Sequence, residues 1–275
     1  MSLVYSFIHQ RGYINYFFNE FWEKEGDPRV KQFPLLKEGP QEMLYIMISY
    51  LFFVKYLGPY LMSNRKPFEL RNLMLVYNVI MVFVNAYFFI EGLICLEFGG
   101  ALRLTEFPDK NDFSPHALRC VNSGFNYYLS KYVDLLDTIF FVLRKKDSQV
   151  TFLHLYHHTS VPTLGWIAMK VGPTCPGLIL FAVLNSFIHV IMYSYYALAA
   201  FGPKMYKYLW WKKYITQLQL SQFAILLLYG LIVGKNLTGY KPIWFWLAFS
   251  QPPIFLYLFY NFYSESYKKS EKKVN

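Results

Sequence analysis

Three histidines lie close together in an apolar stretch of the sequence. His154, His157 and His158 have the spacing i, i+3 and i+4, which places them on one face of a helix. An imidazole can bind a metal ion, act as a base, or attack a thioester as a nucleophile. An ionisable group inside a membrane-spanning helix costs about 2.5–3.5 kcal/mol on insertion scales, so three on one face favour a functional role.

Three other apolar stretches each carry polar residues at helical spacing. These are Lys131, Asp134 and Thr138, with Asp137 beside them; Asn185, His189 and Tyr193; and Thr216, Gln219 and Gln222. At 1.5 Å per residue, the polar residues of the four helices lie roughly 9–16 Å from the same side of the membrane, which predicts one shared pocket. The structural alternatives are an ion pair between Lys131 and Asp134, and interhelical hydrogen bonds for the amides and Tyr193.

Seven apolar segments must position these residues. They cover residues 42–62, 70–93, 115–143, 150–171, 177–200, 211–233 and 242–263. Each can cross a hydrocarbon core, which needs about 20 apolar residues. A content of 55% hydrophobic and 16% charged residues favours the same class. We therefore expect an all-α membrane protein with seven transmembrane helices, a lumenal N-terminal segment (1–41), a transmembrane catalytic domain (42–263) and a cytosolic basic tail (264–275).

Basic residues gather in alternate loops, which predicts the orientation of the chain. The richer set comprises Arg65, Lys66, Arg71, Arg144, Lys145, Lys146, Lys204, Lys207, Lys212, Lys213, Lys268, Lys269, Lys272 and Lys273; the poorer set comprises Arg103, Lys110, Lys170, Lys235 and Lys241. The positive-inside rule places the richer loops and the C-terminus in the cytosol. These loops explain the net charge of +10. The sequence has no basic stripe of the kind that binds nucleic acid, so we expect no nucleic-acid partner.

Two short motifs agree with this topology. Asn236 begins a glycosylation sequon in a loop that the topology makes lumenal. Lys272 and Lys273 form a dilysine near the C-terminus, which resembles the cytosolic retrieval signal of endoplasmic reticulum membrane proteins. The alternative interpretation of the dilysine is a solvated basic tail.

Several functions could use a histidine cluster of this kind. A membrane desaturase or hydroxylase binds two iron ions through about eight histidines, whereas this chain has six, of which His9 and His116 fall outside the predicted bundle. A seven-span receptor or transporter would bind a ligand at a polar midplane without converting it. An acyltransferase would use a neutral imidazole to form an acyl-imidazole from a thioester.

Four motifs in order resemble the very-long-chain fatty acid elongases, the animal-type 3-oxoacyl-CoA synthases. They are KYVDLLDTIFFVLRKK at Lys131–Lys146, HLYHH at His154–His158, NSFIHVIMY at Asn185–Tyr193 and TQLQLSQ at Thr216–Gln222. The resemblance covers the chain from about Gly39 to the dilysine. One departure is Asp134, which stands where the family usually has Glu.

The resemblance implies the condensing enzyme of microsomal fatty acid elongation. Such an enzyme joins a long-chain or very-long-chain acyl-CoA to malonyl-CoA and yields 3-oxoacyl-CoA, CO₂ and CoA. It also implies that six of the seven helices surround a narrow acyl-binding tunnel, closed on the lumenal side. We expect no cofactor and no metal, an endoplasmic reticulum location, and other elongation-cycle enzymes as partners.

The resemblance also suggests roles for individual residues. We expect His157 to be the acyl-bearing nucleophile, His189 a second catalytic imidazole, and His154 and His158 to orient His157 or stabilise an oxyanion. The predicted substrate-binding residues are Lys131, Asp134, Asp137, Asn185, Tyr193, Gln219 and Gln222, with Arg144, Lys145, Lys146, Lys212 and Lys213 for the phosphates of CoA.

Overall fold

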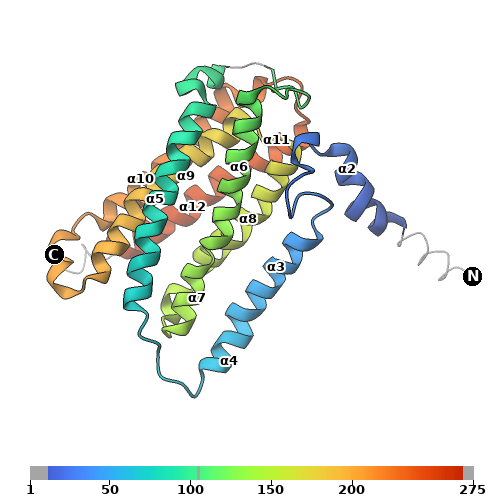
Figure 1. The fold of residues 1–275 in the computed structure, drawn as a ribbon. Helices are drawn as coiled ribbons and strands as arrows, with labels where there is room; N and C mark the ends of the chain where they lie inside the picture. The colour runs from blue at the N-terminus through green and yellow to red at the C-terminus, as the bar shows by residue number, and fades with distance from the viewer. Residues whose placement is uncertain (1–11, 104–105, 269–275) are drawn as a thin grey trace, which may run out of the picture. The chain divides into compact units, whose positions relative to one another are not determined.

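Helices make up most of the part of the chain that the structure describes (Figure 1). The computed structural model describes residues 12–103 and 106–268. Within these ranges no strand forms, and the one isolated bridge joins Glu106 to Thr238. The expectation of an all-α protein is confirmed.

The long helices coincide with the seven predicted segments. In chain order they are α3 (Gln41–Phe52) with α4 (Gly58–Met62), α5 (Arg71–Cys95), α6 (Pro115–Val133) with α7 (Leu136–Leu143), α8 (Phe152–Val171), α9 (Pro176–Ala200), α10 (Lys212–Ile232), and α11 (Pro242–Phe249) with α12 (Gln251–Tyr263). The short elements are η1 (Tyr16–Glu20), α2 (Phe21–Glu25), η2 (Pro28–Val30), η3 (Phe53–Leu57), η4 (Glu97–Arg103), η5 (Asp147–Gln149), η6 (Pro203–Tyr208), η7 (Gly234–Asn236) and η8 (Ser264–Lys268).

Four stretches are long and apolar enough to cross a membrane. They are Gln41–Met62, Arg71–Cys95, Pro176–Ala200 and Lys212–Asn236, found among the described residues. The other predicted spans are broken or more polar: α6 and α7 separate at Asp134, α11 and α12 separate at Ser250, and α8 carries the three histidines. The chain is therefore a multi-pass membrane protein, and the count of seven spans stays a prediction.

Prolines account for two irregularities in these helices. Pro59 has no N–H, and the helix before it widens into the π-helix η3. Pro252 lies in the first turn of α12, directly after the interruption at Ser250, where a missing backbone donor is tolerated.

The chain forms two compact units. Unit 1 comprises Met1–Pro67 and Asp109–Thr174, and unit 2 comprises Phe68–Pro108 and Cys175–Asn275. In unit 1, α6 and α8 pack together in opposite directions, with Gly124 against Met169 and Gly165 against Tyr128. The absence of a Cβ on these glycines allows the two helices to approach closely.

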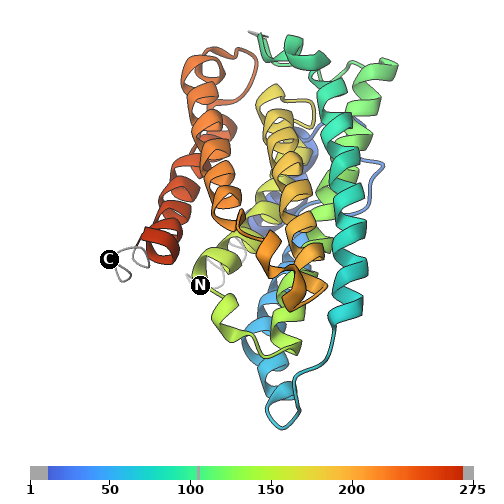
Figure 2. The same ribbon diagram turned by 90° about the vertical axis from the view of Figure 1, so that its left-hand side faces the viewer.

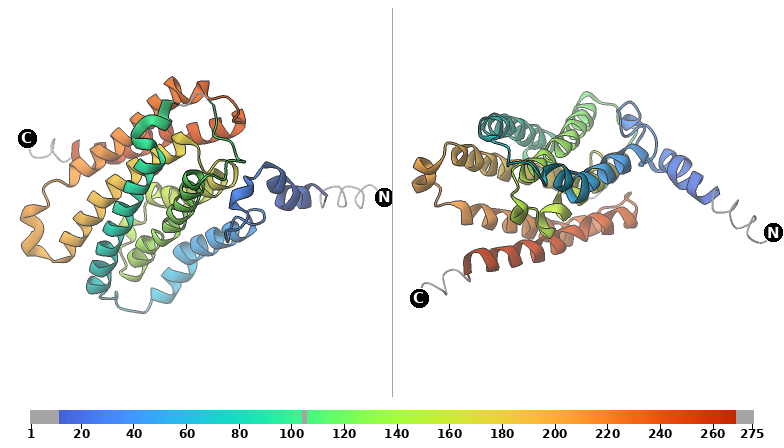
Figure 3. Two further views of the ribbon diagram at one scale, coloured as in Figure 1. Left: turned by 45° about the horizontal axis from the view of Figure 1, so that its top comes forward. Right: turned by 90° about the horizontal axis from the view of Figure 1, so that it is seen from below.

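In unit 2, α9 packs against α5 on one side and α10 on another (Figure 2). Both neighbours run antiparallel to α9: Gly92 of α5 meets Val183, and Gly177 of α9 meets Tyr229 of α10. At the other end, Arg71 donates hydrogen bonds to the carbonyls of Ala200 (2.6 Å) and Phe201 (2.5 Å), at the C-terminus of α9. A cation at this position also interacts favourably with the negative end of the helix dipole. In the same unit, α10 also packs on α12 (Figure 3).

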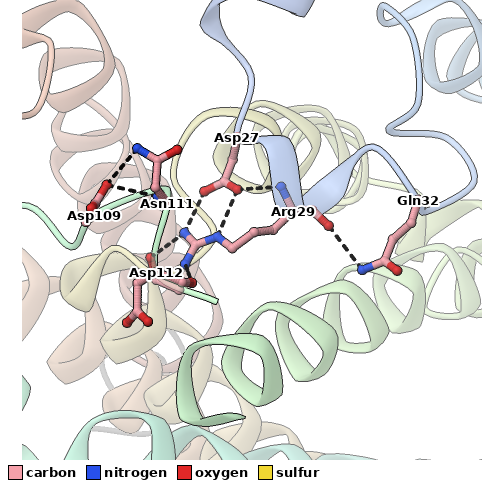
Figure 4. Close-up of polar contacts among 7 residues, drawn as sticks. Asp27, Arg29, Gln32, Asp109, Asn111 and Asp112 are labelled. Atoms are coloured by element: carbon pink, nitrogen blue, oxygen red, sulfur yellow. Dashed lines mark hydrogen bonds and ion pairs between the residues drawn. The ribbon is translucent and has the colours of Figure 1, made fainter. Parts of the chain in front are cut away.

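The segment from Trp22 to Glu38 folds onto the rest of unit 1. Arg29 forms an ion pair with Asp27 at 2.6 Å, with both side chains almost fully buried, and donates to the carbonyl of Asp112 at 2.9 Å (Figure 4). Gln32 donates to the carbonyl of Arg29 at 3.2 Å. Burying an ion pair that has further hydrogen bonds of this kind costs less free energy than burying an isolated charge.

Lys170, near the end of α8, anchors the same segment. Its ammonium group donates to the carbonyls of Leu36 (2.5 Å) and Glu38 (2.8 Å), and Trp166 donates to the carbonyl of Leu35 (2.6 Å). Lys170 is 1% exposed. Lys170, predicted from the sequence to be a loop charge, therefore has a buried structural role.

Candidate active site

The break between α6 and α7 positions the first charged pair. Asp134 ends α6, and its carboxylate forms an ion pair with Lys131 at 2.8 Å. Both side chains are 4% exposed. The ammonium group of Lys131 also lies over the ring of Tyr127, 4.7 Å from its centroid. The structural alternative named for Lys131 and Asp134, a buried ion pair, is therefore present.

The histidines lie on α8, which begins at a well-formed cap. Thr151 accepts a hydrogen bond from the N–H of His154 at 3.2 Å and so satisfies one free donor of the first turn. The rings of His154 and His158 are 4.2 Å apart between centroids, and those of His157 and His158 are 5.1 Å apart. The cluster expected from the i, i+3, i+4 spacing is thus formed.

His157 lies within electrostatic range of the ion pair on α6. It interacts with the charges of both Lys131 and Asp134. Packing against α8 explains this, because Thr138 of α7 bonds His154 near one end of α8 and Gly124 of α6 meets Met169 near the other. Two of the predicted polar stripes, on α6–α7 and on α8, therefore share one part of unit 1.

A chain of hydroxyl groups holds His154. The Tyr50 hydroxyl lies 2.7 Å from the Thr138 hydroxyl, which lies 2.8 Å from Nε2 of His154. Phe141 packs against the same imidazole, with ring centroids 5.2 Å apart. Because Nε2 of His154 is engaged in this chain, His154 is placed to support its neighbours and is poorly placed to attack a thioester.

The other predicted residues of unit 1 lie at its surface or half-buried. Asp137 and Arg144 are half-buried, while Lys145 and Lys146 are exposed. Lys145 has φ 52°, in the left-handed region, and donates to the carbonyl of Ser63 at 3.3 Å. These basic residues follow directly after α7.

The second group of predicted residues lies in unit 2. Asn185 and His189 are each 5% exposed and Tyr193 is 0% exposed, all on α9. The hydroxyl of Tyr193 lies 3.4 Å from that of Tyr77 on α5, and the two rings pack edge to face. The predicted stripe on this helix therefore faces the protein interior.

The stripe on α10 is buried only in part. Thr216 and Gln222 are buried, whereas Gln219 is half-buried. Of the two basic residues predicted near the start of α10, Lys212 is exposed and Lys213 half-buried. Asn236 is exposed, and its side chain donates to the carbonyl of Ile232 at 3.1 Å. The predicted retrieval residues Lys272 and Lys273 lie outside the described residues.

Comparison with known proteins identifies the family of this chain. The model of the ELO family, described as the GNS1/SUR4 family, matches residues 35–275. The chain belongs to this family. Very long chain fatty acid elongase 7 of Rattus norvegicus is 42% identical to this member over 263 residues, 93% of this chain and 90% of the relative. Very long chain fatty acid elongase 1 of Homo sapiens is 41% identical over 253 residues, covering 90% and 89%.

Membership of the ELO family confirms the resemblance drawn from the four motifs. It also favours acyl transfer over the two rival functions. Among residues 12–103 and 106–268, no three His, Cys, Asp or Glu side chains are arranged to hold a metal ion.

Two sets of polar residues in this ELO family member were not predicted from the sequence. Tyr50 is one of 25 tyrosines, and nothing in its spacing marks it as a partner of Thr138. On α5, Asn78 is 3% exposed and Asn85 0% exposed. Their seven-residue spacing inside an apolar span was the available signal.

We expect Thr138→Val to lower the rate of the enzyme without unfolding it. Valine keeps the shape of threonine but removes the hydroxyl between Tyr50 and His154. Loss of one hydrogen bond that orients a catalytic group should reduce kcat about tenfold. The measurement is condensation by purified protein, with Thr163→Val on α8 as a control, because the Thr163 hydroxyl donates to the carbonyl of Thr159 in its own helix. Equal kcat values for wild type and Thr138→Val would contradict the assignment.

Proposed function

We propose that this protein is the condensing enzyme of fatty acid elongation, joining a long-chain or very-long-chain acyl-CoA to malonyl-CoA. The products are CO₂, CoA and a 3-oxoacyl-CoA that is two carbons longer. The observation that carries this proposal is a histidine cluster on α8 in a chain that belongs to the ELO family over residues 35–275. Relatives that are about 40% identical carry the name very long chain fatty acid elongase.

In the first half of the reaction, His157 attacks the carbonyl carbon of the acyl-CoA thioester. The carbon–sulfur bond breaks, CoA leaves with the proton of the imidazole, and an acyl-imidazole remains. Two observations support His157 over His154 in this role. His154 is held by Thr138, and its ring packs on His158, which in turn packs on His157. His154 and His158 therefore orient the nucleophile.

In the second half, malonyl-CoA loses CO₂, and the electrons of the broken carbon–carbon bond form a thioester enolate. The enolate carbon attacks the acyl carbonyl, a new carbon–carbon bond forms, and the bond to His157 breaks as the released imidazole takes up a proton from solvent. His189 is the second imidazole of this half-reaction. Asn185, Tyr193 or Gln219 donate hydrogen bonds to the enolate oxygen.

Charged residues complete the substrate site in this proposal. Arg144, Lys145, Lys146, Lys212 and Lys213 bind the phosphates of CoA, which is consistent with the exposure of Lys145, Lys146 and Lys212. Lys131 and Asp134 set the charge around His157, while Asp137 and Gln222 contribute further polar contacts.

The assay that tests this function is incubation of the purified protein with an acyl-CoA and malonyl-CoA labelled in the methylene carbon. The proposal expects labelled 3-oxoacyl-CoA and one CO₂ for each product. Binding without turnover would support a receptor or transporter instead. Oxidation of the acyl chain that depends on O₂ would support a desaturase-type enzyme. A panel of acyl-CoA substrates in the same assay gives the preferred chain length.

We further propose that seven helices cross the endoplasmic reticulum membrane, and that six of them surround an acyl tunnel closed on the lumenal side. In this arrangement the tail lies in the cytosol, where other elongation-cycle enzymes meet the protein. The asymmetry of basic loops and the apolar length of four helical stretches support it.

Selective permeabilisation tests the proposed orientation. We expect an epitope attached after Asn275 to be stained when only the plasma membrane is opened. An epitope attached before Met1 should need detergent that also opens the reticulum. The reverse pattern would contradict the orientation.

A further inference from the structure

Asn85 on α5 and Ser186 on α9 each have a buried polar atom without a hydrogen-bond partner among the described residues. The atoms are Oδ1 of Asn85 and Oγ of Ser186, and both residues are 0% exposed. The amide nitrogen of Asn85 is already used, because it donates to the carbonyl of Met81 at 2.8 Å. Leaving a buried acceptor or hydroxyl unsatisfied costs about 1–3 kcal/mol for each group.

The register of α5 and α9 brings these residues to one level. Tyr77 of α5 meets Tyr193 of α9, and further along Gly92 meets Val183. Counting along the helices between these two contacts places Asn85 opposite about residue 188 of α9. Asn85 therefore lies at a height between those of Ser186 and His189.

The faces of the two helices also agree. On α5, Met81, Asn85 and Gly92 recur at four- and seven-residue spacing, so they share the side that meets α9. On α9, Val183 and Ser186 are three residues apart, and Tyr193 follows seven residues after Ser186. Asn85 and Ser186 thus belong to the surfaces through which α5 and α9 pack.

The chemistry of the two atoms matches a water molecule. Oδ1 of Asn85 can only accept a hydrogen bond, and the serine hydroxyl can donate one and accept others. Buried waters typically make about three hydrogen bonds to polar groups that have no other partner. A water that donates to Asn85 and accepts from Ser186 would retain one hydrogen for a further acceptor.

We propose that Asn85 and Ser186 bind a structural water molecule between α5 and α9, and that this water orients the imidazole of His189. His189 is one helical turn after Ser186 and is itself 5% exposed. The inference rests on the proposed function in one respect, because it takes His189 to be catalytic. Asn85 and Ser186 act in it as positioning residues, which affect the reaction through His189.

The test is a double-mutant cycle on kcat for condensation. Asn85→Leu removes the acceptor with little change in volume, and Ser186→Ala removes the hydroxyl. Each single variant should lower kcat about tenfold and leave both KM values within about twofold. Because both variants lose the same water, the double variant should be no worse than about threefold below either single variant, a departure from additivity.

Asn78→Leu is the matched control. Asn78 is a buried amide on the same helix, whose Nδ2 also has no hydrogen-bond partner among the described residues, but it lies two turns before Asn85 and near the level of Tyr193. The Asn78→Leu variant should have a kcat within about twofold of wild type, and its effect on kcat should be additive with that of Ser186→Ala. Additive effects of Asn85→Leu and Ser186→Ala, or unchanged kcat in Ser186→Ala, would overturn the water site. Since Ser186→Ala is a small change, it also serves if Asn85→Leu does not fold.

A parallel His189→Ala variant separates the two proposals. If it retains full kcat, the catalytic role of His189 is wrong and the water cannot act through it. If it is inactive while Asn85→Leu and Ser186→Ala behave like wild type, only the water site is wrong. Density for a water between the two residues in a high-resolution structure, lost in Ser186→Ala, gives the direct structural readout.

Discussion

His157→Ala should abolish condensation while the protein remains folded. The imidazole of His157 supplies the atom that takes the acyl group, and alanine offers no replacement nucleophile. Removing a covalent nucleophile commonly lowers kcat by at least about 10³-fold. We expect the fold to survive because His157 is half-buried and alanine is a strong helix former. The measurement is release of CO₂ from labelled malonyl-CoA at saturating acyl-CoA.

The matched control for this variant is His116→Ala. His116 is an exposed histidine near the start of α6 in the same unit, and it has no role in the proposed mechanism. It should retain wild-type kcat. Full activity in His157→Ala, in protein whose thermal unfolding midpoint is unchanged, would show that the acyl group is carried elsewhere.

Asp134→Ala should be strongly destabilising, by about 3–5 kcal/mol in the free energy of unfolding. In the native protein the side chain of Lys131 is 4% exposed and its ammonium group lies 2.8 Å from the Asp134 carboxylate. The substitution removes this carboxylate and leaves the buried charge. Thermal unfolding in detergent or lipid nanodiscs measures the loss. An unchanged unfolding midpoint would mean that the ion pair has no structural role.

Two further variants separate charge from shape at this pair. Asp134→Glu keeps the carboxylate and restores the residue that the family usually has, so most of the stability should return. Replacing both partners with apolar residues, as in Lys131→Met with Asp134→Leu, should also recover stability, because no buried charge is left unpaired. If the double replacement is stable but inactive, the pair serves the chemistry around His157 as well as the fold.

The helices could be predicted closely because the signals for them are local. Apolar runs about 20 residues long, separated by Pro, Gly and charged loops, determined where α5, α8, α9 and α10 begin and end. The breaks at Asp134 and Ser250 were missed because both positions lie inside an apolar run. The contacts of Lys170 with the carbonyls of Leu36 and Glu38 were missed for a different reason. They join residues more than 130 positions apart, which no local pattern reports.

The candidate site shows the same limit. Helical spacing was enough to group His154, His157 and His158, and the Lys131–Asp134 pair, because those partners lie within one turn. The resemblance to the elongases, confirmed by the family match, supplied the reaction. Tyr50 and Asn85 were not found, because their roles depend on which helix packs against which. Spacing within one helix cannot show that Tyr50 meets Thr138, nor place Asn85 at the level we infer for it.

In the proposed mechanism, His157 carries the acyl group between the two halves of the reaction. The most direct measurement is mass spectrometry of the protein after incubation with acyl-CoA in the absence of malonyl-CoA. We expect release of one CoA for each active site and an added acyl mass on the peptide that contains His157, lost again when malonyl-CoA is supplied. An acyl mass on a different residue, or condensation at the full rate with no acyl-enzyme formed, would contradict it.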